Sequence, residues 1–353
     1  MLRHRAADPA LDRFMTTITP HIAPPSNATQ GIIAVELGMG FFVVQDVLMK
    51  TLLDVHPLWN LIFVRSIVTL VLLVPVMLWL GGTHRILTPL WPLHLARAVL
   101  LAAGFSLFYA AFPFMGLAEV TTIFFSAPLM TVLLAAVVLR ETIGWHRIAA
   151  LLVGFAGVVI AMNPAGENFG WVAVLPLACA LSYAISQIIA RKIGDGESSL
   201  TAGLQTISFM GVMILPMGWL CNQLITIGPE FHHLRMGWPA NLAQDWPLLL
   251  LLGFVGMMGW ILLSRAYQVA NASLIAPFDY TYMPIAVAAG YLLFDEIPQT
   301  GTLVGMALII ASGLYVGARE LRAARRHDDP TVLAEASFVP GSPLPPQNSD
   351  EIL

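Results

Sequence analysis

Charged residues are scarce in this sequence. They make up 11% of its 353 residues, whereas a soluble domain usually carries about 25%. Only two cysteines are present, Cys179 and Cys221, and their separation matches neither a disulfide framework nor a metal site. The scarcity of charge excludes most soluble folds, and we expect no metal, no cofactor and no nucleic-acid partner.

Apolar residues take the place of the missing charges. They make up 58% of the chain, and nine Trp, 28 Gly and 24 Pro fit a helical protein that crosses a membrane many times. A helix needs about 20 apolar residues to cross about 30 Å of hydrocarbon. Ten segments meet this requirement, near residues 31–50, 57–80, 93–114, 119–139, 146–162, 170–190, 201–221, 247–267, 273–294 and 300–317. The sequence therefore predicts an all-α polytopic membrane protein with ten transmembrane helices.

The basic residues predict the orientation in the membrane. If both termini are cytoplasmic, 14 of the 17 basic residues lie on the cytoplasmic side, and only Lys50, Arg65 and Arg235 lie toward the outside. This bias follows the positive-inside rule. We expect residues 1–30 to form a disordered cytoplasmic tail and residues 319–353 a basic, then disordered, cytoplasmic tail. The long connection 222–246 is expected to be external.

The ten spans divide into two related halves, residues 31–162 and 170–318, joined by a linker at 163–169. Pro128 and Pro284 are 156 residues apart, and so are Gly157 and Gly313. Five spans per half invert the second copy relative to the first. Inverted repeats of this kind place a substrate site near the midplane, where the halves meet.

Several motifs resemble those of the EamA-type drug/metabolite transporter superfamily. In the first half the similarity runs from Arg97 through SAPLMTVLLAAVVLRE to LLVGFAGVVI, which ends at Ile160. In the second half APFDY, the FDE ending and ASGLY resemble the matching signature, and LIFVRSIV resembles the second helix of the family. Where the family often has glycine before the acid of each signature, this chain has Arg140 and Asp295.

The resemblance covers about residues 31–320 and has functional implications. It implies a ten-helix bundle with cytoplasmic ends that moves small organic solutes across a bacterial inner membrane by alternating access. The family members that this chain resembles include carriers of riboflavin or S-adenosylmethionine and exporters of amino acids.

Two acids inside predicted spans are candidates for substrate binding or ion coupling. Asp279 lies in APFDYTYMPIAVAAGYLLFDE, where a membrane-centre carboxylate costs about 2.5 to 3.5 kcal/mol. It binds a cationic group, titrates during transport, or pairs with Arg265. Glu36 faces the central site or forms a hydrogen bond between helices. Because Asp46 and Lys50 are four residues apart, they are expected to pair along their helix near the outer interface.

Other side chains complete the candidate site. Arg65 lies too deep in its helix to be solvated, so it pairs with a carboxylate, Asp46 first, or holds an anionic substrate group. Aromatic residues from the central helices suit a flat solute but are also typical of core packing. The aromatic candidates are Tyr109, Phe125, Tyr183, Trp260, Tyr267 and Tyr282, with Phe108 and Phe124 beside them. Pro128 and Pro284 are candidate kinks or gates, and Glu141 and Glu296 are expected to cap helices.

The sequence thus predicts a secondary active transporter for a small organic metabolite, aromatic or amphiphilic, in the lipid bilayer. No ATP-binding motif is present, so the energy comes from protons, another ion or the solute's own gradient. We expect no catalytic residues and no enzyme activity. A flippase for a lipid-linked solute and a non-transporting membrane subunit are the alternatives, and a homodimer is left open.

Overall fold

The computed structural model describes residues 28–80, 88–138, 144–163, 170–193, 199–238, 244–270 and 272–327. These residues form α-helices joined by short links. The α-helices are α2 (Ala28–Leu53), α3 (Leu58–Leu80), α4 (Trp91–Ala110), α5 (Leu117–Phe124), α6 (Ala127–Val138), α7 (Trp145–Met162), α8 (Val174–Ile193), α9 (Ser199–Leu224), α10 (Trp246–Val269), α11 (Ala272–Ile275), α12 (Tyr282–Phe294) and α13 (Thr300–His327). Short 3₁₀ segments are η1 (Trp171–Ala173), η3 (Pro229–Leu234) and η4 (Ala276–Thr281).

The helices are long and apolar enough to cross a membrane many times. Within the described residues, nine stretches meet that criterion, with α5 and α6 counted together. The tenth expected span is divided into α11, η4 and α12. It nevertheless runs the length of α2, because Ile275 lies beside Gly31 at one end of α2 and Phe294 lies beside Lys50 at the other. The protein is therefore an all-α polytopic membrane protein.

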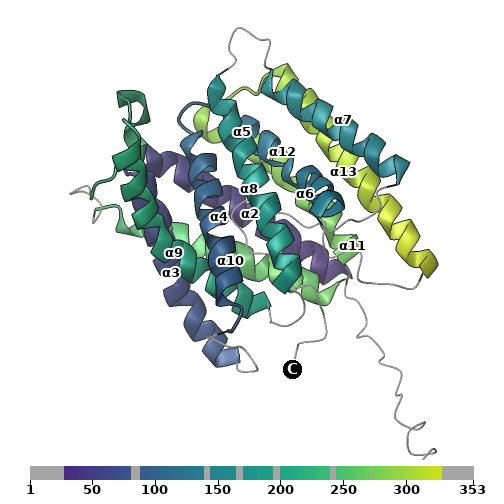
Figure 1. Cartoon of the computed structure of the whole chain (residues 1–353), viewed down its shortest axis with the longest axis horizontal. Helices are drawn as coiled ribbons and strands as arrows, with labels where there is room; N and C mark the ends of the chain where they lie inside the picture. The colour runs from purple at the N-terminus through teal and green to yellow at the C-terminus, as the bar shows by residue number, and fades with distance from the viewer. Residues whose placement is uncertain are drawn as a thin grey trace, which may run out of the picture.

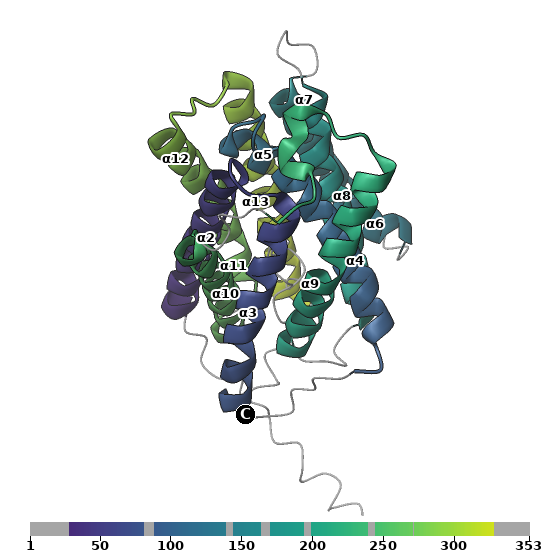
Figure 2. The ribbon, with the colours of Figure 1, turned by 90° about the vertical axis from the view of Figure 1, so that its left-hand side faces the viewer.

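The packing of the helices follows the predicted inverted repeat (Figure 1). Helix α2 packs along α10, and its counterpart in the second half, α8, packs along α4, the counterpart of α10. In the same way α4 packs on α9 and α10 on α3. The pairs α3 with α9 and α7 with α13 join equivalent helices. In Figure 2, α3 accordingly lies between α9 and α10. Exchanging the halves reproduces the arrangement.

The fourth span of each half is broken at the same place. In the first half α5 ends at Phe124 and α6 begins at Ala127, and Pro128 lies in the first turn of α6. In the second half η4 ends at Thr281 and α12 begins at Tyr282, and Pro284 lies in its first turn. A proline has no N–H to bond the carbonyl four residues before it, so a regular helix cannot continue through that position. Pro128 and Pro284 thus begin new helices after the breaks.

Two helix ends adopt the left-handed conformation. Asn163 ends α7 with φ of 45°, and Asp295 ends α12 with φ of 54°. Left-handed backbone favours glycine, and Asn and Asp tolerate it better than other residues. This explains why glycine is common at the position of Asp295 in the family that the sequence resembles. The equivalent Arg140 lies outside the described residues.

We call the end of the bundle at Leu53 and Leu58 the outer end and the end at Ala28 the inner end. The connection 222–246 covers the outer end through η3. Trp59 Nε1 and Asn222 Nδ2 donate to the Leu234 carbonyl, at 2.8 and 3.0 Å. The buried His233 lies 3.3 Å from the Ala110 carbonyl, and burial lowers its pKa to about 4. A neutral histidine at neutral pH therefore holds this connection against α4.

Helices α7 and α13 approach closely through glycine. A Cβ on Gly157 would lie 2.8 Å from the Gly305 carbonyl oxygen and 2.9 Å from Leu308 Cβ. We expect Gly157→Ala to destabilise the protein by about 1 to 3 kcal/mol, because backbone cannot move aside for the added methyl group. The measurement is thermal unfolding of the detergent-purified protein.

The matched control is Gly40→Ala on α2, where an added Cβ meets nothing within 4 Å. This substitution should leave the melting temperature unchanged or raise it, because alanine favours the helix by about 1 kcal/mol over glycine. Equal melting temperatures for the two variants would contradict the close packing of α7 on α13.

Candidate functional site

Helix α2 carries an acid on its most deeply buried stripe. The stripe repeats every three or four residues, as expected for one face of a helix. It consists of Val35, Met39, Phe42, Asp46, Met49 and Leu53, each at most 1% exposed. Asp46 therefore points into the bundle. Glu36, in contrast, is only partly buried on the flank of the stripe.

Asp46 is the centre of a buried polar network. Tyr282 O–H from α12 donates to Asp46 Oδ2, and Tyr109 O–H from α4 donates to Oδ1 at 3.1 Å. Gln45 Nε2 donates to the Tyr109 oxygen at 3.1 Å and lies 3.5 Å from Asp46 Oδ1. Asp46 only accepts in these bonds, which is the arrangement that suits a carboxylate. We call Gln45, Asp46, Arg65, Tyr109 and Tyr282 the central network.

Arg65 joins the central network through a tyrosine. Its Nη1 donates to the Tyr109 hydroxyl oxygen at 3.2 Å, and the same hydroxyl donates to Asp46 Oδ1. Arg65 was expected to pair with Asp46 first, and the two are linked in this indirect way. The expected pairing of Asp46 with Lys50 along α2 is wrong, because Lys50 turns to Glu296 instead.

The two broken spans meet beside the central network. Phe125, in the break between α5 and α6, stacks on Tyr282 with ring centroids 5.7 Å apart and an angle of 29° between the planes. It also contacts Tyr280 at 5.9 Å. The side-chain hydroxyl of Ser126, in the same break, is buried and has no hydrogen-bond partner. Phe125 and Tyr282 thus bring the two halves together at their breaks.

A second group of candidates lies in the inner half. Tyr267 O–H on α10 donates to Asp279 Oδ2 of η4 at 3.0 Å, and Asp279 is 2% exposed. Arg265 is exposed, and no ion pair joins it to Asp279 among the described residues. Tyr183 on α8 packs its ring against Phe124 at 5.8 Å.

Two remaining candidates lie apart from these groups. Trp260 is 1% exposed and lies over Gly203 of α9, and its indole N–H has no hydrogen-bond partner. Glu36 lies nearer the inner end, where Thr281 Oγ1 is 3.1 Å from its Oε2 and 2.6 Å from the Phe278 carbonyl. A hydroxyl has one proton and can donate to only one of these two oxygens at a time.

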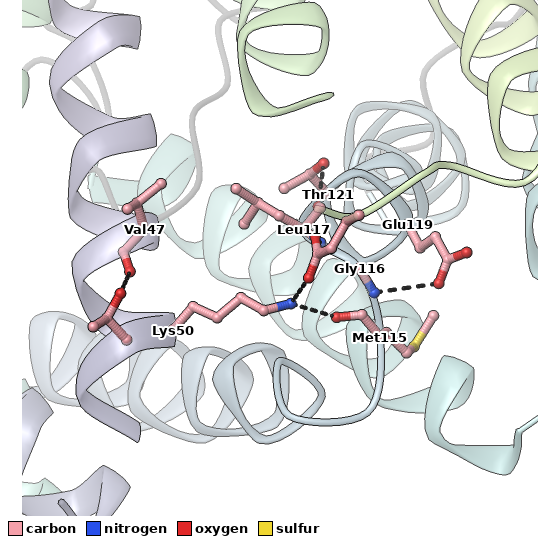
Figure 3. Close-up of polar contacts among 9 residues, drawn as sticks. Val47, Lys50, Met115, Gly116, Leu117, Glu119 and Thr121 are labelled. Carbon is pink, nitrogen blue, oxygen red and sulfur yellow. Dashed lines mark hydrogen bonds and ion pairs between the residues drawn. The ribbon is translucent and has the colours of Figure 1, made fainter. Parts of the chain in front are cut away.

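An ion pair ties the halves together at the outer end (Figure 3). Lys50 Nζ at the end of α2 contacts Glu296 Oε1, after α12, and donates to the Met115 carbonyl at 2.9 Å. Glu296 Oε2 accepts from the Leu117 N–H at 2.7 Å. Glu296 was expected to cap a helix, and it caps α5 of the other half. Glu141 lies outside the described residues. We call the contacts of Lys50 and Glu296 the outer latch.

The structure also supplies site residues that the sequence analysis treated only as ion-pair partners or did not discuss. Asp46 and Gln45 were not among the predicted binding candidates. Asp46 nevertheless accepts hydrogen bonds from two of those candidates, Tyr109 and Tyr282. The signal available was the three-and-four spacing of Asp46 with Met39, Phe42 and Met49. No group of three metal-ligating side chains occurs in the described part of the chain.

Comparisons with known proteins identify similar chains. The model of the EamA-like transporter family matches residues 29–163 and 170–317. An S-adenosylmethionine uptake transporter from Rickettsia bellii is 27% identical over 81% of this chain and 95% of its own length. A riboflavin transporter from Vibrio cholerae is 25% identical over 82% and 93%. A riboflavin transporter from Rhizobium johnstonii is 30% identical over 66% and 72%.

A solved structure has a similar fold. It is described as "Crystal structure of protein", and it superposes with a TM-score of 0.55 at 16% identity. The match covers 85% of this chain and 99% of the other. This likeness concerns the fold alone.

Tyr109→Phe tests the central network. Removing the hydroxyl leaves Arg65 and Asp46 without the group that links them, so we expect a loss of about 1 to 3 kcal/mol in thermal stability. The control is Tyr291→Phe on α12, whose side chain is 57% exposed. If the Tyr109→Phe protein has the same melting temperature as the control, the hydrogen bonds of Tyr109 contribute nothing to stability.

Proposed function

Because the chain belongs to the EamA-like transporter family, we propose that it is a secondary active transporter that moves a small organic metabolite across the bacterial inner membrane by alternating access. The family and the named relatives are transporters rather than enzymes, and the apolar helices place the chain in a membrane. The substrate class, the energy source and the orientation are the parts that we propose.

One observation carries the proposal of a central site. The two broken spans meet at the stack of Phe125 on Tyr282, and Tyr282 donates to Asp46 in the central network. Interrupted helices are where transporters built from inverted repeats commonly bind their solute, since the breaks free polar backbone groups near the midplane. A solute bound there contacts both halves, so movement of one half against the other exposes it alternately to each side.

The outer latch supports a gate on one side of this site. Lys50 and Glu296 belong to different halves, and Glu296 also caps α5, the first part of a broken span. Opening the outer end must therefore separate this ion pair. In the inner half Glu36 and Thr281 make a weaker contact between α2 and η4.

The aromatic lining supports a flat or amphiphilic solute. Phe105, Phe108, Phe124, Tyr109 and Tyr183 form a continuous set of ring contacts at 5.0 to 6.4 Å. Pockets for small molecules are mostly apolar with a few polar groups that fix orientation. Two relatives are named for S-adenosylmethionine and riboflavin, and both molecules contain a fused aromatic ring system. We propose a metabolite of this chemical kind.

Proton coupling is the energy source that we propose to test first. A protonated Glu36 can donate to Thr281, which leaves the Thr281 proton for the Phe278 carbonyl, whereas an ionised Glu36 competes with that carbonyl. The protonation state of Glu36 thus changes the bonding of η4, the element that carries Asp279. The distribution of basic residues supports a cytoplasmic location for both termini, on the same side of the bundle.

Uptake into proteoliposomes tests the transport proposal. We expect labelled S-adenosylmethionine or riboflavin to accumulate inside the vesicles when a pH gradient is imposed. In Asp279→Asn or Glu36→Gln the internal concentration should rise only to the external concentration. The matched control is Glu230→Gln, because Glu230 is an exposed acid of η3.

The same vesicles separate the alternatives. Accumulation that does not respond to a pH gradient, in the wild type as in both variants, would refute proton coupling but leave the carrier in place. Scrambling of labelled lipid without movement of either solute would refute the carrier and support a flippase.

The outer latch can be tested through a native thiol. Cys179 on α8 is 1% exposed, and α8 begins at the outer end. We expect Glu296→Gln, in a Cys221→Ser background, to speed labelling of Cys179 by an impermeant maleimide added outside cells. The Glu230→Gln variant should label at the wild-type rate. Equal rates for all three proteins would mean that the ion pair does not close the outer end.

A further inference from the structure

Arg97 is a buried arginine that has no carboxylate partner among the residues that the structure describes. It lies on α4, about two turns from the inner end, and its side chain is 2% exposed. Its Nε has no hydrogen-bond partner, and no ion pair with a carboxylate forms among the described residues. The sequence placed this residue at the cytoplasmic end of the predicted span 93–114.

A buried, unpaired charge is costly, so the absence of a partner needs a reason. Burying an ion costs several kcal/mol unless an opposite charge and hydrogen bonds compensate. Arg65 provides the contrast within this protein. It is 4% exposed, and its Nη1 donates to Tyr109, which donates to Asp46. Hydrogen bonds therefore connect the arginine, the tyrosine and the acid without a gap at Arg65.

An acid, a tyrosine and an arginine also occur in the inner half, as Asp279, Tyr183 and Arg97. Tyr183 lies on α8, which packs along α4, the helix that carries Arg97. Asp279 accepts from the hydroxyl of Tyr267, and Arg97 forms no ion pair with a carboxylate in the described part of the chain. Arg97 Nε is therefore a buried donor that none of the described residues uses.

The ring of Tyr183 also belongs to the aromatic set. It lies 6.4 Å from Phe105 and 5.8 Å from Phe124, both edge to face. Phe105 lies on α4, the helix that also carries Arg97, so a solute held against these rings would lie beside that helix. A guanidinium holds a carboxylate or phosphate through two parallel N–H bonds, which are among the stronger hydrogen bonds in proteins.

We propose that Arg97 binds an anionic group, carboxylate or phosphate, of the transported solute. This inference rests on the proposed transport function and narrows it, because it assigns the solute a negative charge. The bound anion pairs with the Arg97 guanidinium. The charge on Arg97 therefore serves to bind the solute and does not stabilise the solute-free protein.

Thermal unfolding of the solute-free, full-length protein gives the first test. Arg97→Met removes an uncompensated charge and should raise the melting temperature by about 2 °C or more. Arg65→Met breaks a closed network and should lower it. If Arg97→Met lowers the melting temperature as Arg65→Met does, or does not fold, Arg97 is structural and the proposal is wrong.

Ligand binding gives the second test, with two pairs of probes. S-adenosylmethionine is compared with its decarboxylated analogue, and riboflavin 5′-phosphate with riboflavin, so each pair differs in one anionic group. We expect the wild type to bind the anionic member of one pair about ten- to hundredfold more tightly. The pair that shows the preference identifies carboxylate or phosphate as the group.

The variants decide whether Arg97 causes the preference. Arg97→Gln should abolish it, Arg97→Lys should keep part of it, and Arg265→Gln, which removes an exposed arginine of α10, should leave it intact. A wild type without preference in either pair, including one that binds none of the four probes, would overturn the proposal, as would an unchanged preference in Arg97→Gln.

These measurements do not depend on transport. A protein that binds the anionic probe through Arg97 but moves no solute into proteoliposomes would refute the proposed transport function and leave the Arg97 site in place. A protein that transports neutral riboflavin, with equal binding of its phosphate, would keep the transport function and refute the anion site.

Discussion

Backbone groups freed by the two broken spans determine where the rest of the structure must lie. In hydrocarbon an unbonded N–H or carbonyl costs several kcal/mol, so irregular backbone is tolerated only where protein covers it. The breaks at 125–126 and 276–281 therefore have to face the interior. Once they do, Phe125 and Tyr282 meet, and Tyr282 places its hydroxyl on Asp46. The central network is thus a consequence of burying the breaks.

Buried charges are compensated differently toward the outer and the inner end of the bundle. In the outer half Asp46 and Arg65 share Tyr109, so two opposite charges are joined through one hydroxyl. In the inner half Asp279 is held by Tyr267, and Arg97 has no carboxylate partner in the described residues. Because the first arrangement is complete without a ligand, it suits a role in holding the halves together. The second leaves Arg97 Nε unpaired among the described residues, which suits the anion binding that we propose.

The sequence predicted the fold well and the site only in part. Hydropathy located the spans, and the offset of 156 residues located both breaks through Pro128 and Pro284. It could not show which side of α2 faces inward, because lipid-facing positions such as Leu37 and Val44 are as apolar as buried ones. The moderately buried Glu36 was therefore favoured over Asp46. The partner of Lys50 was missed for another reason: Glu296 is 246 residues away, and only the tertiary fold brings them together.

The repeat constrains the backbone far more than the side chains. Phe125 and Thr281 occupy equivalent positions, and so do Ser126 and Tyr282, since each pair is separated by the same 156 residues. At each equivalent position one half has an aromatic ring and the other a small hydroxyl residue. The stack of Phe125 on Tyr282 therefore joins positions that are not equivalent. In the transport cycle that we propose, a symmetric backbone permits the same rocking movement toward either side, while the asymmetric side chains give the site a direction. A solute with one charged end and one aromatic end would then have a single orientation in the site.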